Sequence, residues 1–185
     1  MPLSHFHVLD LCYQGTPGAI ASYCARHPGG ALLVETGPAS TLPALTAELA
    51  RLNLRPEEVT DVLLTHIHLD HAGAAWYFAR RGARIHVHPK GAPHLIDPSR
   101  LWESAGRLYG DALVPLWGEI HPIPAEQVHV LRDEEEIVIG PHRFVALDTP
   151  GHANHHMAYL YENACFSGDV AGVRLYGTRH LRLPT

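Results

Sequence analysis

The residues best suited to chemistry lie close together in one stretch, residues 65–73. Three imidazoles and one carboxylate fall within six of its positions, at His66, His68, Asp70 and His71. Imidazole nitrogens and carboxylate oxygens are ligands of zinc and related divalent metals. The apolar run 61–64 predicts a strand before the stretch, and 74–81 predicts a helix after it. The stretch is therefore expected to be a strand-to-helix loop, a common position for catalytic groups.

The spacing divides these donors into two groups. His66 and His68 alternate with apolar residues, so in extended backbone both imidazoles leave on one side. Asp70 and His71 turn the other way, and Gly73 lets the backbone pass close beneath. Two such groups suit two adjacent zinc-like ions. Chance clustering explains a single imidazole in a chain with 16 histidines, but it explains the ordered set poorly.

The pattern His66-x-His68-x-Asp70-His71 resembles the signature of the metallo-β-lactamase superfamily, in its glyoxalase II-like, general hydrolase branch. Two further pieces follow in the order that the resemblance requires: D-T-P-G-H at 148–152 and F-S-G-D at 166–169. With the E-T-G turn at 35–37, the resemblance extends from about the first strand to the end of the sequence. These elements are specific for the superfamily and weak for the substrate.

The resemblance implies a ligand set and a mechanism. One metal ion would be bound by His66, His68 and His152, a second by Asp70 and His71, with Asp169 bridging the two. Two zinc ions, with iron or manganese as alternatives, would lower the pKa of a shared water. Asp70 would be the catalytic residue that orients this water or moves its proton. An ester, thioester, lactone, amide or phosphoester would suit such a site as substrate.

The remaining sequence predicts an α+β fold in one domain, residues 1–185. Strands are expected at 5–13, 19–26, 31–35, 61–64, 83–88, 128–132, 137–140, 143–148, 157–161 and 164–167, and helices at 42–52, 74–81 and 99–109. The acidic run 133–136 predicts a solvated hairpin tip. The resemblance implies the αββα four-layer sandwich of the superfamily.

The resemblance also leads us to expect a truncated sequence. The family pattern has a further histidine for the second metal, beyond another strand and helix. His180 lies too close behind Asp169 to match that position well, and the chain ends at Thr185. We therefore expect the C-terminal strand and helix of the family to be missing, with a longer natural protein as the favoured explanation.

Several other residues have two interpretations. Glu35 either supports the metal loop from behind, as the resemblance implies, or faces solvent at a strand end. His86 and His88 are expected in a supporting or surface role, and His155 or His156 either orients a ligand or lies at the surface. Residues 89–124 predict a helical pair whose aromatics, Trp102, Tyr109 and Trp117, lie mostly in the core. The alternative for that segment is a lid in which these aromatics and His94 contact substrate.

Composition limits the classes of partner. The net charge of −5 and the absence of a basic block argue against nucleic acid, and no apolar run is long enough to cross a membrane. Three widely spaced cysteines indicate reduced core residues and a cytoplasmic protein without a signal peptide. The expected partner is a small-molecule substrate, and a homodimer is left open.

Two other functions compete with the di-zinc hydrolase. One is a mononuclear iron enzyme similar to the persulfide dioxygenases, with His66, His152 and Asp169 as its ligands. The other is a non-catalytic metal-binding remnant, suggested by the missing histidine.

Overall fold

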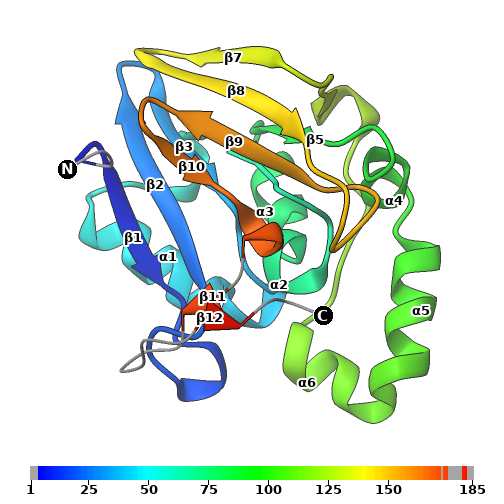
Figure 1. Cartoon of the computed structure of the whole chain (residues 1–185). Helices are drawn as coiled ribbons and strands as arrows, with labels where there is room; N and C mark the ends of the chain where they lie inside the picture. Colours follow the sequence, from blue (N-terminus) through cyan, green and yellow to red (C-terminus); the bar gives the residue numbers. More distant parts are fainter. Residues whose placement is uncertain (1–3, 172, 175–180, 183–185) are drawn as a thin grey trace.

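Two β-sheets packed face to face form the centre of the fold (Figure 1). The structure is a computed structural model in which residues 4–171, 173–174 and 181–182 are described. The larger sheet has six strands in the order β1-β2-β3-β4-β5-β6. Its antiparallel half consists of β1 (Phe6–Asp10), β2 (Ala21–His27) and β3 (Gly30–Val34). Its parallel half consists of β4 (Val59–Leu63), β5 (Arg84–Val87) and β6 (Val128–Val130).

The smaller sheet is antiparallel and comes from the second half of the chain. Its order is β10-β9-β8-β7, with β7 (Glu135–Ile139), β8 (His142–Asp148), β9 (Met157–Tyr161) and β10 (Ala164–Phe166). A two-stranded pair, β11 (Val173–Arg174) and β12 (Leu181–Arg182), follows.

Helices connect the strands and lie mainly on one side of the larger sheet (Figure 1). They are α1 (Leu42–Arg51), α2 (Leu69–Ala72), α3 (Ala75–Ala79), α4 (Ala92–Ile96), α5 (Ser99–Tyr109) and α6 (Leu113–Trp117). Short 3₁₀ turns occur at Tyr13–Gly15, Ala39–Thr41, Pro56–Glu58, Gly110–Ala112, Ala125–Gln127 and Gly168–Val170. None of the helices that the structure describes is long and apolar enough to cross a membrane.

Strand β3, in the middle of the larger sheet, is buried on both faces, and its side chains alternate between two cores. In β3, Ala31 and Leu33 belong to the core between the sheet and the helices. Leu32 and Val34, one position along, belong to the core between the two sheets. The larger sheet therefore contributes side chains to two separate hydrophobic cores, one on each of its faces.

This arrangement confirms the α+β sandwich that the sequence predicted. Among the described residues it shows three layers: helices, the larger sheet and the smaller sheet. No described helix covers the outer face of the smaller sheet (Figure 1), where Val138 and Leu160 are exposed.

Two sequence expectations are wrong in detail. The acidic run 133–136 is not a hairpin tip, because β6 pairs with β5 in the larger sheet while β7, which already includes Glu135, pairs with β8. The run therefore crosses from one sheet to the other. All three cysteines are free, as expected, but only Cys24 lies in the core, whereas Cys12 and Cys165 are exposed. His180 lies outside the described residues.

Candidate metal centre

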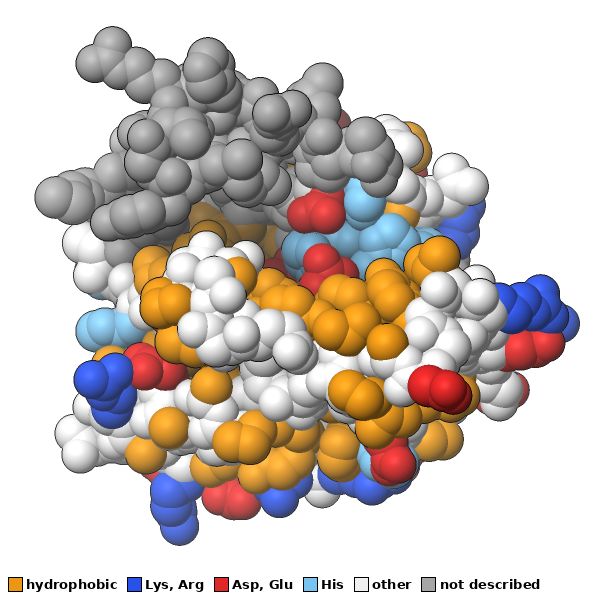
Figure 2. Space-filling model, turned by 90° about the horizontal axis from the view of Figure 1, so that it is seen from below, with side chains coloured by type: hydrophobic (Ala, Val, Ile, Leu, Met, Phe, Trp, Pro, Cys, Tyr) orange, Lys and Arg blue, Asp and Glu red, His pale blue; other side chains and the backbone are white. Residues whose placement is uncertain are grey.

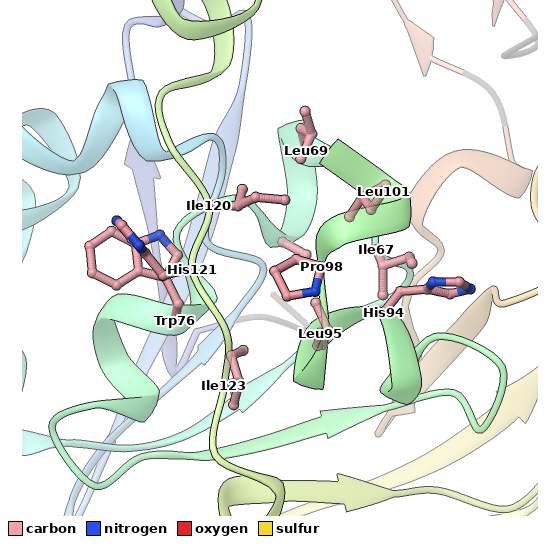
Figure 3. A pocket seen from close by; sticks show the side chains of 12 residues that line it. Ile67, Leu69, Trp76, His94, Leu95, Pro98, Leu101, Ile120, His121 and Ile123 are labelled. Atoms are coloured by element: carbon pink, nitrogen blue, oxygen red, sulfur yellow. The ribbon is translucent and has the colours of Figure 1, made fainter. Parts of the chain in front are cut away.

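The histidine-rich stretch begins where β4 ends and includes the one-turn helix α2. Its apolar side chains, Ile67 and Leu69, point into the helical layer, as Figure 3 shows. There they surround a cavity of about 10 Å³ with residues of α4, α5 and the segment 120–123. That volume is about the smallest that admits one water, so this side of the loop is a packed support. The intervening histidines are directed to the opposite side.

Three imidazoles converge on that side, two from the loop and one from the turn after β8. The Nδ1 atom of His68 lies 3.1 Å from Nε2 of His66 and 2.9 Å from Nε2 of His152. A tetrahedral zinc with Zn–N bonds of about 2.0–2.1 Å separates its nitrogen ligands by roughly 3.3 Å. The three nitrogens are thus arranged at nearly the spacing that one ion requires, and all three could hold it.

A second group shares His66 and adds His71 and Asp169. Nε2 of His71 lies 3.3 Å from Oδ1 of Asp169, and Oδ2 of Asp169 lies 3.4 Å from Nε2 of His152. The Asp169 carboxylate therefore spans the two groups. Asp70 lies at their edge, with Oδ2 3.5 Å from Nε2 of His71. The structure brings together all six side chains that the sequence singled out.

Glu35 supports the loop from behind and does not face solvent. It follows β3 with a left-handed backbone conformation (φ 64°), and it is 6% exposed. Its Oε1 accepts a hydrogen bond of 3.1 Å from the backbone N–H of Thr65, and Oε2 lies 3.6 Å from Nδ1 of His71. This second oxygen has no hydrogen-bond partner among the described residues. A carboxylate in this position orients the loop and the His71 ring together.

His156 occupies a second supporting position. Its Nδ1 lies 2.8 Å from the Thr149 hydroxyl, and its Nε2 accepts a 3.2 Å hydrogen bond from the backbone N–H of Asp169. Gly168, at φ +48°, lets the chain pass so closely that a Cβ atom there would lie 2.5 Å from both His156 Nε2 and the Thr65 hydroxyl oxygen. His156 therefore positions Asp169 and is not one of the converging ligands.

Glycine is required on the other side of the loop as well. A Cβ atom on Gly73 would lie 2.4 Å from the carbonyl oxygen of Leu69 and 2.9 Å from Cα of Pro38. The close passage of the backbone that the sequence predicted is confirmed.

The electrostatics of the cluster follow from burial and from its mixed charges. Burial, with the neighbouring imidazoles, holds the pKa of His66 far below its usual value, so the ring is neutral. Burial also lowers the pKa of His71, but the nearby carboxylates, Glu35 first among them, raise it overall well above the usual value. Burial raises the pKa of Asp70, yet hydrogen bonding and charge from His71 leave it lower than usual. Asp70 is therefore ionised at neutral pH.

The donor set fits metal ions. Neutral imidazoles and ionised carboxylates are the forms that bind zinc, as His66 and Asp70 already are, whereas His71, whose pKa is raised, must release a proton when an ion binds. Nδ1 of His66 contacts the Thr65 hydroxyl at 3.0 Å, which orients its Nε2 toward the group. Nδ1 of His152 is buried without a hydrogen-bond partner among the described residues.

The remaining histidines lie around the centre in supporting or distant roles. His86 is buried and pairs with Asp61 at 2.8 Å, and His88 contacts Asp148 at 3.3 Å. Among the residues that the structure describes, neither belongs to a group that could hold a metal. His94 lines the small cavity beneath the loop, whereas His155 lines the cleft beside the ligands.

A cleft of about 580 Å³ opens directly onto the candidate ligands His68, Asp70, His152 and Asp169. Its opposite wall comes from α5 and α6, including Tyr109 and Trp117. On the face seen in Figure 2, hydrophobic side chains lie next to the histidine and acidic ones. The expectation that the aromatics of 89–124 lie mostly in the core is wrong: Trp102, Tyr109 and Trp117 are all half-buried, and none of them belongs to either hydrophobic core. The i, i+3, i+4 spacing in 101–108 was the signal that could have indicated this wall.

Comparison with known proteins agrees with this geometry. The family model described as the metallo-beta-lactamase superfamily matches residues 15–182. The chain belongs to this superfamily. Its relatives in the superfamily include proteins named as metallo-hydrolases and hydroxyacylglutathione hydrolases.

Individual relatives are similar over much of this chain but are longer than it. A metallo-beta-lactamase fold-containing protein of Sulfurisphaera tokodaii, ST1585, is 31% identical over 120 residues, which are 63% of this chain and 46% of that protein. A hydroxyacylglutathione hydrolase of Fuscovulum blasticum is 30% identical over 69% of this chain and 40% of its own. The aligned segments thus cover less than half the length of these two curated relatives.

Solved structures show the same fold. The crystal structure of ST1585 matches 94% of this chain and 66% of its own, with a TM-score of 0.78 and 25% identity. The family protein TTHA1429 of Thermus thermophilus matches 90% of this chain and 59% of its own, with a TM-score of 0.72 and 28% identity.

Proposed function

We propose that the chain carries the catalytic centre of a hydrolase that uses water activated by two zinc ions. The substrate is a small ester, thioester or lactone. The observation that carries this proposal is the pair of ligand groups that share His66 and are spanned by the Asp169 carboxylate. Two groups in contact suit two ions close enough to share one water.

In this proposal each side chain has a defined role. His66, His68 and His152 would hold one ion, His71 and Asp70 would hold the other, and Asp169 would be a ligand within reach of both groups. When bound, the ions supply hydroxide at neutral pH and polarise the bond under attack.

Asp70 is the residue that orients the nucleophilic water and can accept its proton. It lies in the cleft, beside both ligand groups, and its pKa is lower than usual. An ionised carboxylate there accepts a hydrogen bond from the nucleophilic water and orients it.

The side chains favour two ions over the mononuclear iron alternative. In a single site made of His66, His152 and Asp169, His71 would not be a metal ligand. The buried contact of His71 with Glu35 at 3.6 Å would then orient a ring that binds no ion. A non-catalytic metal-binding remnant would bind zinc without turning over any substrate, so activity measurements on zinc-loaded protein distinguish it from the hydrolase.

The test combines metal content with turnover. Protein purified without chelators and reconstituted with zinc should contain about two zinc ions per chain and hydrolyse members of an ester, thioester and lactone panel. His71→Ala should reduce the content to about one ion. His129→Ala is a matched control, because His129 is half-exposed and pairs with Glu135 away from the centre. Failure to bind zinc after reconstitution, or zinc-loaded protein inert on the whole panel, would refute the proposal.

A further inference from the structure

Helix α5 directs its apolar face to the cleft. Leu101, Ala105 and Leu108 recur at helical spacing on one face, and Glu103 and Arg107 form an ion pair elsewhere on the helix. An amphipathic helix normally buries its apolar face against a core. Yet α5 contains no fully buried residue, and the Leu108 side chain is 74% exposed. Leu101 packs partly against the core of the helical layer, whereas the part of the face around Leu108 is available to a ligand.

That face forms one wall of the cleft that opens onto the candidate metal ligands. Tyr109 and Trp117 extend the wall with aromatic surface. The Trp117 ring lies 5.3 Å from that of Tyr109 and is stacked on Tyr13 at 5.4 Å between centroids. A volume of about 580 Å³ lies within the range of clefts that enclose small organic ligands. We call these five residues, Leu101, Ala105, Leu108, Tyr109 and Trp117, the apolar wall.

The charges in the cleft restrict the ligand further. Among the described residues that line it, the charged ones are Asp70 and Asp169, and no lysine or arginine contributes. Away from the proposed metal ions, a leaving group with several carboxylates or phosphates finds no cationic partner on these residues. A neutral ligand with an apolar group suits them better.

We propose that the apolar wall binds the acyl or aryl group of a neutral ester or thioester, with its reacting carbonyl at the metal centre. This inference rests on the proposed hydrolase function and names the substrate class of the same site. The wall and the candidate ligands face one cleft, so a substrate can occupy both at once.

The first experiment measures how kcat/KM depends on acyl length, with zinc-loaded protein and neutral N-acetylcysteamine thioesters from acetyl to octanoyl. Each methylene buried on the wall should raise kcat/KM about fourfold until the wall is covered. Leu108→Ser should flatten this increase, so that the ratio of octanoyl to acetyl kcat/KM falls relative to the wild type. Because Leu108 is exposed, the variant should keep the thermal midpoint of the wild type.

Leu160→Ser is the matched control. Leu160 is the other exposed leucine among the described residues and lies on the outer face of the smaller sheet. Its variant should retain the full dependence on acyl length. An equal loss in both variants would overturn the assignment of the wall.

The second experiment compares two thioesters with the same acyl chain, one of N-acetylcysteamine and one of glutathione. The proposal expects no advantage for the glutathione thioester, which carries two carboxylates. A tenfold preference for it, or kcat/KM independent of acyl length, would overturn the inference while the hydrolase function stands. No turnover of any thioester, ester or lactone would instead refute the hydrolase function, and this inference with it.

Discussion

Replacing Glu35 by glutamine tests whether the support behind the loop controls metal affinity. Glutamine has the same length and still offers an oxygen to the Thr65 N–H, which Glu35 contacts at 3.1 Å. It removes the negative charge that lies 3.6 Å from Nδ1 of His71. The perturbation is thus electrostatic and leaves the loop's backbone hydrogen bond in place.

The expected effect on zinc is larger than the effect on folding. Outer partners of metal ligands typically contribute 10- to 100-fold in affinity, which is about 1.4–2.7 kcal/mol. A hydrogen bond to a neutral acceptor is weaker than one to a carboxylate by about 1 kcal/mol. Because glutamine is neutral, the variant no longer buries a charge at this position, and this gain in stability offsets part of that cost. Glu35→Gln should therefore bind the weaker of the two zinc ions 10- to 100-fold less tightly with little change in unfolding free energy.

The assay is a competition for zinc against a chromophoric chelator, run on folded protein with a parallel urea titration. Glu35→Ala separates the two roles, because it also leaves the buried Thr65 N–H unpaired and should cost a further 1–3 kcal/mol, roughly, in stability. Glu136→Gln is the matched control, since Glu136 is exposed and pairs with Arg143. Zinc affinities within twofold of the wild type for Glu35→Gln would refute the reasoning.

Three further predictions concern the same centre. Asp70→Asn and His152→Ala should each lower kcat/KM by at least about 100-fold and keep the native circular dichroism spectrum; wild-type turnover in either would place the site elsewhere. Gly168→Ala should lower the unfolding free energy by about 1–3 kcal/mol in urea titrations, because of its positive φ and the 2.5 Å contacts of the added Cβ; an unchanged midpoint would contradict the tight passage. In EDTA, acidification from pH 7.5 to 5 should destabilise the protein. Burial lowers the pKa of His156 to about 4, so below pH 6.5 the unfolded chain binds a proton that the folded chain does not. His156→Gln should reduce the slope of stability against pH, and an identical slope would contradict this assignment.

The metal loop was predictable because the residues that determine its conformation are neighbours in the sequence. The alternation of His66 and His68 with apolar residues determines which side each occupies once the stretch is extended. The apolar residues then pack against the helical layer, as Ile67 does in Figure 3. Only the one-turn helix α2 within the loop was not expected.

Features that depend on distant pairing were not predictable in the same way. Two strands separated by a short acidic run are typical of a hairpin, yet β6 and β7 join different sheets. What decides this is the neighbours: Ile85 opposite Val128 in one sheet, and Ile137 opposite Phe144 in the other. Neither partner is visible within the local pattern.

Glu35 shows most clearly why the sequence alone does not decide whether a polar residue supports a site. A glutamate at a strand end is compatible with solvent or with burial, and the residue itself is the same in both cases. The parallel pairing of β3 with β4 determines that Glu35 is buried, because it places the end of β3 beside the start of the metal loop. The backbone N–H of Glu35 donates to the Leu63 carbonyl at 2.9 Å, so its side chain can turn to Thr65 and His71. The support of the metal centre is thus a consequence of sheet topology.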